Sequence, residues 1–429
     1  MYWIMSLLIS CSPLIAQDKF DSQHSILVEA VIPDGEVISN NPSMWSAQST
    51  IEDQLLYTIG QLNGLEGGAP DTSKTELEIK DVIKLDDNSY KIKYAAKLFV
   101  AWPREQALPN SFEFYLPRRA DYIGLNEFYN LYGSDERGAK KCLAWEAHEV
   151  TNGIFWYYYR PLKSSCPLRL EGNPHIIRTK SYLSISKLNT DNKYPEYEKI
   201  WEDKKLVITA IFGKAKEGST SNYDAGASAY VETVNELIRR FGMPKTSSHD
   251  FAGRSYFSDG IKTPEIFLTF ETDKGIVDAA LFLIEGIRSA DGNFTKKFNQ
   301  RTLNSDFISY SGHSGLGANI RALARMGKFQ KDQYQIFLIN GCDTFAYVDE
   351  SLTVAHAMVN PEFNGEKFID LITNAMPSYF HMNARSNMAV IDSLFGETRT
   401  YKEILGLFDP AQRAVVTGEE DNRWPESFY

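Results

Sequence analysis

Two residues in the C-terminal half combine a reactive side chain with a position that favours chemistry. His313 follows the run Asp306-Phe-Ile-Ser-Tyr-Ser-Gly, and Cys342 follows Tyr334-Gln-Ile-Phe-Leu-Ile-Asn-Gly. Both runs have the length and apolar character of buried strands. Neighbouring parallel strands would place these residues at one sheet edge, where open α/β sheets carry their functional groups. A thiolate can attack a carbonyl carbon, and a histidine can accept and donate the protons of the reaction. The pair therefore predicts cysteine-type hydrolysis.

Glycines flank both candidate residues. Gly312, Gly315 and Gly341 allow the backbone to approach a substrate closely. Backbone amides beside the two side chains could also form an oxyanion hole. The structural alternative is a histidine and a buried thiol that merely end two core strands, because a buried free cysteine is common in proteins.

These two blocks resemble the clan CD cysteine peptidases, which include caspases, metacaspases, legumains, clostripain and gingipains. Tyr310-Ser-Gly-His313 is similar to the histidine block of metacaspases and gingipains, and Phe337-Leu-Ile-Asn-Gly-Cys342-Asp-Thr344 is similar to the gingipain-like cysteine block. The resemblance covers residues 204–400. It implies a caspase-hemoglobinase-like fold, Cys342 as nucleophile, His313 as proton donor to the leaving amine, and the amides of Ser314 and Cys342 in the oxyanion hole.

The sequence departs from this family at two places. Ser314 follows the histidine where the family usually has glycine, and Gly341 precedes the cysteine where the family more often has alanine. The first departure leaves the oxyanion role of the Ser314 amide in doubt. A degenerate peptidase fold in a non-catalytic envelope protein is therefore one alternative to an active cysteine endopeptidase.

A serine hydrolase is the other alternative. Gly312-His-Ser-Gly315, followed by a helical segment, resembles the nucleophile elbow of α/β-hydrolases, with Ser314 as nucleophile. Asp343 and His381 follow in the chain order that such a triad requires. The elbow needs a small residue two places after the serine, and this chain has Leu316 there.

Strand and helix patterns predict an α/β C-terminal domain over 204–410 and an α+β N-terminal domain over 24–188. The C-terminal domain is expected to have a mostly parallel sheet with helices on both faces. Its expected strands are 206–212, 266–270, 306–311, 334–340 and 368–373, and its expected helices are 227–241, 318–326, 381–395 and 401–408. The run 277–284 fits either a hairpin strand or a helix. In the N-terminal domain we expect strands at 25–32, 75–84, 89–101 and 111–115, helices at 44–65 and 124–132, and a buried strand in the aromatic run 154–159.

The cysteines and the N-terminus predict export. Residues 1–18 contain an apolar segment that is too short to span a bilayer and fits a signal peptide. Leu8-Ile-Ser-Cys11 resembles a lipobox, which predicts lipidation of Cys11 and a membrane anchor; cleavage near Ala16 is the alternative. Cys142 and Cys166 are disulfide candidates in an oxidising compartment, or two unpaired thiols. We therefore expect a secreted protein or one of the cell envelope, in the periplasm or anchored to the outer membrane.

Charge and motifs limit the partners. The net charge is −11 and no cluster of Lys and Arg offsets it, so nucleic acid is not an expected partner. The chain has no Cys/His spacing typical of zinc sites and no glycine-rich phosphate loop. We therefore expect no metal or cofactor, and a peptide or protein as the substrate.

Overall fold

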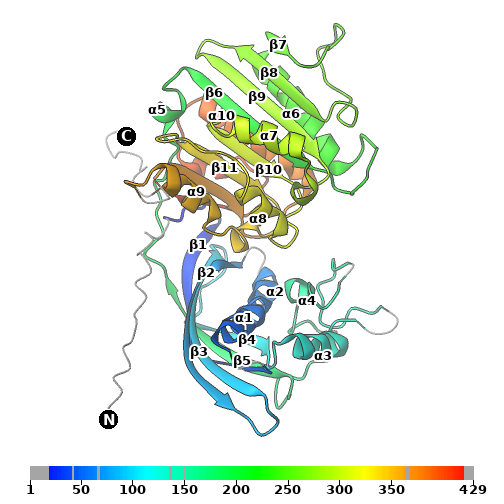
Figure 1. Cartoon of the computed structure of the whole chain (residues 1–429), viewed down its shortest axis with the longest axis vertical. Helices are drawn as coiled ribbons and strands as arrows, with labels where there is room; N and C mark the ends of the chain where they lie inside the picture. Colours follow the sequence, from blue (N-terminus) through cyan, green and yellow to red (C-terminus); the bar gives the residue numbers. More distant parts are fainter. Residues whose placement is uncertain are drawn as a thin grey trace.

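The chain folds into two β-sheets, which lie one above the other along the long axis of the molecule (Figure 1). The computed structural model describes residues 19–40, 43–64, 68–134, 138–148, 150–363 and 367–419. The predicted signal segment, with Cys11 and Ala16, lies outside these ranges. No helix among the described residues combines the length and the apolar character needed to cross a bilayer.

The N-terminal part, residues 19–188, contains a five-stranded antiparallel sheet in the order β2-β3-β1-β5-β4. Its strands are β1 (Ser25–Ser39), β2 (Ala69–Lys84), β3 (Tyr90–Pro103), β4 (Ser111–Pro117) and β5 (Ile176–Ile185). Its helices are α1 (Met44–Leu55), α2 (Tyr57–Asn63), α3 (Tyr122–Tyr132) and α4 (Phe155–Tyr158). Alternate residues of β1 such as Val28, Ala30 and Ile32 are buried in the core, the period of two that marks a sheet with one covered face.

The aromatic run 154–159 is buried as predicted, but the prediction of a strand is wrong. Phe155–Tyr158 forms the short helix α4. Tyr57, Phe128, Phe155 and Tyr159 pack in one cluster, with ring centroids between 5.3 and 5.9 Å apart. In a strand Phe155 and Tyr159 would share a face but lie roughly 13 Å apart, whereas a helical turn brings residues four apart to within about 6 Å of each other. The helical turn therefore lets the rings of Phe155 and Tyr159 touch, with centroids 5.5 Å apart.

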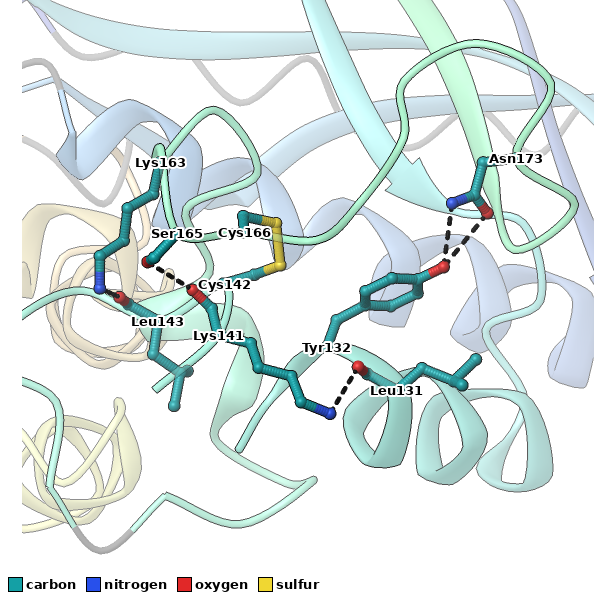
Figure 2. Close-up of a disulfide and its surroundings, with 9 residues drawn as sticks. All are labelled: Leu131, Tyr132, Lys141, Cys142, Leu143, Lys163, Ser165, Cys166 and Asn173. Atoms are coloured by element: carbon teal, nitrogen blue, oxygen red, sulfur yellow. Dashed lines mark hydrogen bonds between the residues drawn. A yellow bond between two sulfur atoms is a disulfide. The ribbon is translucent and has the colours of Figure 1, made fainter. Parts of the chain in front are cut away.

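The predicted disulfide between Cys142 and Cys166 is present, with Cα atoms 4.4 Å apart (Figure 2). It closes the segment that carries α4. Within that segment the Ala144 amide donates to the Tyr158 carbonyl at 2.8 Å, and the Arg160 amide donates to the Cys142 carbonyl at 2.8 Å. These two hydrogen bonds join residues 142–144, at the start of the closed segment, to residues 158–160 at the end of α4.

The C-terminal part, residues 204–419, is a mixed sheet of eight strands in the order β13-β12-β11-β10-β6-β9-β8-β7. The strands are β6 (Lys205–Gly213), β7 (Thr246–Ser247), β8 (Glu265–Glu271), β9 (Ile276–Ile284), β10 (Phe307–Ser311), β11 (Gln335–Asn340), β12 (Ile369–Asn374) and β13 (Ala414–Gly418). The five central strands are parallel and lie in the order β9, β6, β10, β11 and β12. The strands β7, β8 and β13 at the edges are antiparallel to their neighbours. The run 277–284 is thus the second strand of a hairpin with β8.

Helices cover both faces of this sheet, as predicted. Helices α6, α10 and α11 lie on one face, and α7, α8 and α9 lie on the other (Figure 1). The helices are α5 (Tyr197–Ile200), α6 (Ala225–Phe241), α7 (Gly292–Arg301), α8 (Ala318–Ala324), α9 (Ser351–Val359), α10 (Asn383–Phe395) and α11 (Tyr401–Leu405). Short 3-10 turns are η1 (Ile287–Ser289), η2 (Thr344–Ala346) and η3 (Phe380–Met382). Burial on both faces explains why the central strands read as continuous apolar runs rather than alternating ones.

Candidate functional site

The candidate site lies at the carboxyl ends of β6, β10 and β11. Strands β6 and β10 are neighbours, and the chain leaves β6 toward β8 and β9 but leaves β10 toward β11 on the opposite side. Connections that diverge in this way open a crevice at the strand ends. Ser311 and Asn340 are register partners at the ends of the parallel pair β10 and β11. His313 and Cys342 each follow two residues later. The strand adjacency on which the predicted pair depends is confirmed.

The two loops that carry these residues touch each other. The Gly312 amide donates to the Asn340 carbonyl at 3.0 Å. A Cβ atom added to Gly341 would lie 2.8 Å from the Gly312 carbonyl oxygen and 3.2 Å from the Ser314 nitrogen. This close approach is the physical reason for glycine before the cysteine, where the resemblance leads one to expect alanine.

Two backbone amides at this junction are available as donors. Within the described part of the chain, neither the Ser314 amide nor the Cys342 amide donates a hydrogen bond to another residue. The Ser314 carbonyl, by contrast, accepts from the amides of Gly317 and Asn319, both at 3.1 Å. Unpaired amides beside a thiol can stabilise the negative charge of a tetrahedral intermediate.

His313 is exposed, and its ring is engaged with a backbone carbonyl and a phenylalanine. Nε2 lies 2.9 Å from the Ala215 carbonyl, which follows β6, and the ring packs edge-on against Phe380 with centroids 5.0 Å apart. A carbonyl only accepts, so Nε2 carries the proton in this arrangement. The His313 carbonyl accepts from the Tyr310 hydroxyl and the Asn319 amide group, both at 2.8 Å. The backbone is therefore fixed while the ring is held by a single bond.

Cys342 is a free, partly buried cysteine. Its Sγ donates to the Ser378 carbonyl at 3.4 Å. Burial, and after it the neighbouring Asp343 carboxylate, raise the pKa of this thiol to about 11, against smaller opposing effects of hydrogen bonds with the Ser378 backbone, the Tyr157 hydroxyl and the Cys342 backbone. The opposition of Asp343 to ionisation is as predicted from the sequence, whereas the larger effect of burial is not visible there. At neutral pH the side chain is a thiol in this conformation.

Asp343 connects the site to the N-terminal part of the chain. It is fully buried, with φ of 50°. Its Oδ2 accepts from the Tyr157 hydroxyl of α4 at 2.7 Å and from the Asn63 side chain of α2 at 3.3 Å. Burial raises the Asp343 pKa to about 6, and Tyr157, Arg160 and Asn63 hold it below the value that burial alone would give.

No pattern in the sequence placed the N-terminal part at the site, so the sequence analysis did not identify Asn63, Tyr157 and Arg160, which surround Asp343. The available signal was the buried aromatic run itself. A buried tyrosine needs a partner for its hydroxyl, and Tyr157 finds that partner in Asp343.

The groups of the alternative serine triad are not brought together. Ser314 is buried, and no histidine among the described residues forms a hydrogen bond to its hydroxyl. The His381 ring stacks on Tyr379 with centroids 5.8 Å apart. Asp343 accepts hydrogen bonds from the Asn63 side chain of α2 and the Tyr157 hydroxyl of α4, and not from a histidine of the described residues. The arrangement offers a thiol as the nucleophile and two backbone amides as hydrogen-bond donors, rather than an activated serine.

In the ranges that the structure describes, no group of three or more His, Cys, Asp and Glu side chains is placed to hold a metal ion. Comparison with known proteins does not identify the chain: no family model matches it, and no curated protein matches it significantly.

Proposed function

We propose that the chain is a cysteine peptidase that acts through Cys342 and His313. The observation that carries the proposal is the in-register parallel pairing of β10 and β11, with the histidine and the cysteine each two residues beyond paired strand ends. The amides of Ser314 and Cys342 give further support, because neither donates to another residue within the described ranges. The similarity of both sequence blocks to clan CD peptidases makes a peptide or protein the proposed substrate.

The reaction follows from these groups. Cys342 passes its thiol proton to His313, the resulting thiolate attacks the substrate carbonyl, a C–S bond forms, and the amides of Ser314 and Cys342 stabilise the oxyanion. His313 gives a proton to the leaving amine as the C–N bond breaks. Water then hydrolyses the thioester, which releases the carboxylic acid and restores the thiol. Only the Ser314 amide takes part, so a side chain at that position is compatible with the proposed role.

Two changes must precede this chemistry. The His313 ring must leave the Ala215 carbonyl, and Cys342 must lose its proton although burial and Asp343 oppose this. Apo catalytic pairs often tighten only when substrate binds. We interpret the conformation described here as a latent one.

The test compares wild-type protein with Cys342→Ala and Ser314→Ala on a peptide library. We expect Cys342→Ala to abolish cleavage and iodoacetamide labelling at that position, and Ser314→Ala to retain most of the cleavage because its amide remains. Activity that is lost in Ser314→Ala and kept in Cys342→Ala, together with labelling by a fluorophosphonate, would establish the serine hydrolase instead.

A non-catalytic envelope protein on a degenerate peptidase fold is the second candidate. The thiol pKa of about 11 and the bond from Sγ to the Ser378 carbonyl favour it. An absence of cleavage by the wild type under conditions in which Cys342 is labelled by iodoacetamide would select this candidate.

The proposed location is the cell envelope or the exterior. The Cys142–Cys166 disulfide supports it, because such bridges persist in oxidising compartments. Anchoring through Cys11 is tested by expressing the chain in a bacterium and measuring the mass of its mature N-terminus. An acylated Cys11 supports the anchor, and a free N-terminus near residue 17 refutes it.

A further inference from the structure

The segment that follows Cys342 is held by the N-terminal part of the chain on two sides. On one side, Tyr157 and Asn63 bond to Asp343 at 2.7 and 3.3 Å. On the other, residues at the start of β2 bond to carbonyls around η2. The Thr72 hydroxyl donates to the Ala346 carbonyl at 2.6 Å, and the Ser73 hydroxyl lies 2.7 Å from the Val348 carbonyl.

The same part of the chain also lies beside the thiol. The Tyr157 hydroxyl donates to Asp343, the residue after Cys342, at 2.7 Å, and Tyr158 lies close enough to Cys342 to interact with it electrostatically. Both tyrosines belong to α4, which is fixed by the aromatic cluster of Tyr57 and by the Cys142–Cys166 disulfide. Because α4 is mounted firmly on the N-terminal part, it cannot swing away from Cys342 as an independent lid. Uncovering the thiol requires the N-terminal part to move as a unit.

Such movement must break hydrogen bonds and also separate apolar contacts. Trp156 packs against Tyr347 and Phe20 against Phe345, with ring centroids 6.4 and 5.9 Å apart, in addition to the hydrogen bonds around η2. The open state is therefore a minor one that is reached by rare local opening. A local opening would expose Cys342 without unfolding either sheet.

We propose that the N-terminal part is an inhibitory cap: α4 covers Cys342 while α2, α4 and β2 hold the segment 343–348, and the site becomes reactive only when these contacts open. The inference rests on the proposed function in treating Cys342 as the nucleophile. It adds that the N-terminal part regulates that nucleophile.

The test measures the rate at which iodoacetamide alkylates Cys342 in the full chain with its disulfide intact, with the modified residue identified by mass spectrometry. Thr72→Val keeps the shape of the side chain and removes one hydroxyl-to-carbonyl bond across the cap. Ser181→Ala is the matched control, because the Ser181 hydroxyl donates to the Phe112 carbonyl at 2.9 Å within the N-terminal sheet. The double variant Thr72→Val/Ser73→Ala weakens the cap further, and circular dichroism checks that each variant is folded.

If alkylation proceeds through opening, its rate follows the population of the open state. Loss of one neutral hydrogen bond should then raise the rate by about fivefold in Thr72→Val, and more in the double variant. Ser181→Ala should alkylate at the wild-type rate. Equal rates in wild type, Thr72→Val and the double variant would overturn the cap, as would an equal increase in Ser181→Ala.

Peptide cleavage, measured in parallel, separates this inference from the proposed function. Faster alkylation together with faster Cys342-dependent cleavage in the Thr72 variants supports both. Faster alkylation with no cleavage in any variant supports the cap and refutes the peptidase. Cleavage by the wild type that is unaffected by the Thr72 variants, with unchanged alkylation, supports the peptidase and refutes the cap.

Discussion

Replacing Asp343 by Asn should make Cys342 more acidic and more reactive. The Cys342 pKa is about 11 in the wild type, and the Asp343 carboxylate is one of its causes. Asp343 has a pKa of about 6, so it is charged at pH 8. Asparagine removes the charge, tolerates the left-handed backbone at φ of 50°, and still offers an oxygen to Tyr157.

The magnitude follows from the thiolate fraction. A thiol with this pKa is ionised to about one part in a thousand at pH 8, and each unit by which the pKa falls raises that fraction tenfold. Because burial is the larger cause and remains in the variant, we expect a pKa shift of about one unit and an alkylation rate about tenfold higher at pH 8.

The assay is the rate of iodoacetamide alkylation at Cys342 from pH 6 to 11, under conditions in which the protein stays folded. The wild-type rate should rise about tenfold per pH unit up to about pH 10 and then level off toward the pKa of about 11, and the curve of Asp343→Asn should be shifted to lower pH. Asp332→Asn is the matched control: Asp332 is exposed and has φ of 61°, so the same charge is removed from the same backbone conformation. Curves that coincide for wild type and Asp343→Asn would refute the electrostatic reasoning.

Three further predictions concern stability. Replacing Cys142 and Cys166 by serine should lower the free energy of unfolding by about 3 kcal/mol, measured by denaturant titration, because the disulfide closes a loop with a sequence separation of 24; an unchanged value would show that the link adds no stability. Gly341→Ala should cost about 1–3 kcal/mol in the same titration, since its Cβ would press on the Gly312 carbonyl, and full stability would mean that the two loops separate easily. Burial raises the Asp306 pKa to about 8, so its contribution to stability is present below pH 3.8 and is lost as pH rises through 8. Between pH 6 and 9 the wild type should therefore lose about 3 kcal/mol more than Asp306→Asn in pH-dependent denaturation, and parallel losses would contradict this pKa.

Local patterns in the sequence were sufficient for the strands that carry the candidate site, for the ends of those strands and for the disulfide, but not for β5, β7, β13 and the helix α4. The apolar runs 206–212, 306–311 and 334–340 identify buried strands because each residue in them must avoid water on both faces of a sheet. Alternation of these strands with helices predicted the parallel pairing that places His313 and Cys342 at one edge. Two cysteines close together in a chain that is expected to be exported predicted the disulfide between Cys142 and Cys166.

Tertiary structure alone decided the state of the candidate site. The helical form of 155–158 depends on an aromatic cluster with Tyr57 and Phe128, and the pKa of Cys342 depends on burial. The partners of Asp343 lie 186 and 280 residues away in the chain. Sequence periodicity records whether a residue faces water or a core, but protonation and hydrogen bonding depend on which distant groups surround the atom. The sequence by itself thus determined where a thiol and an imidazole stand on the sheet, and only tertiary packing decided that the thiol is partly buried and protonated.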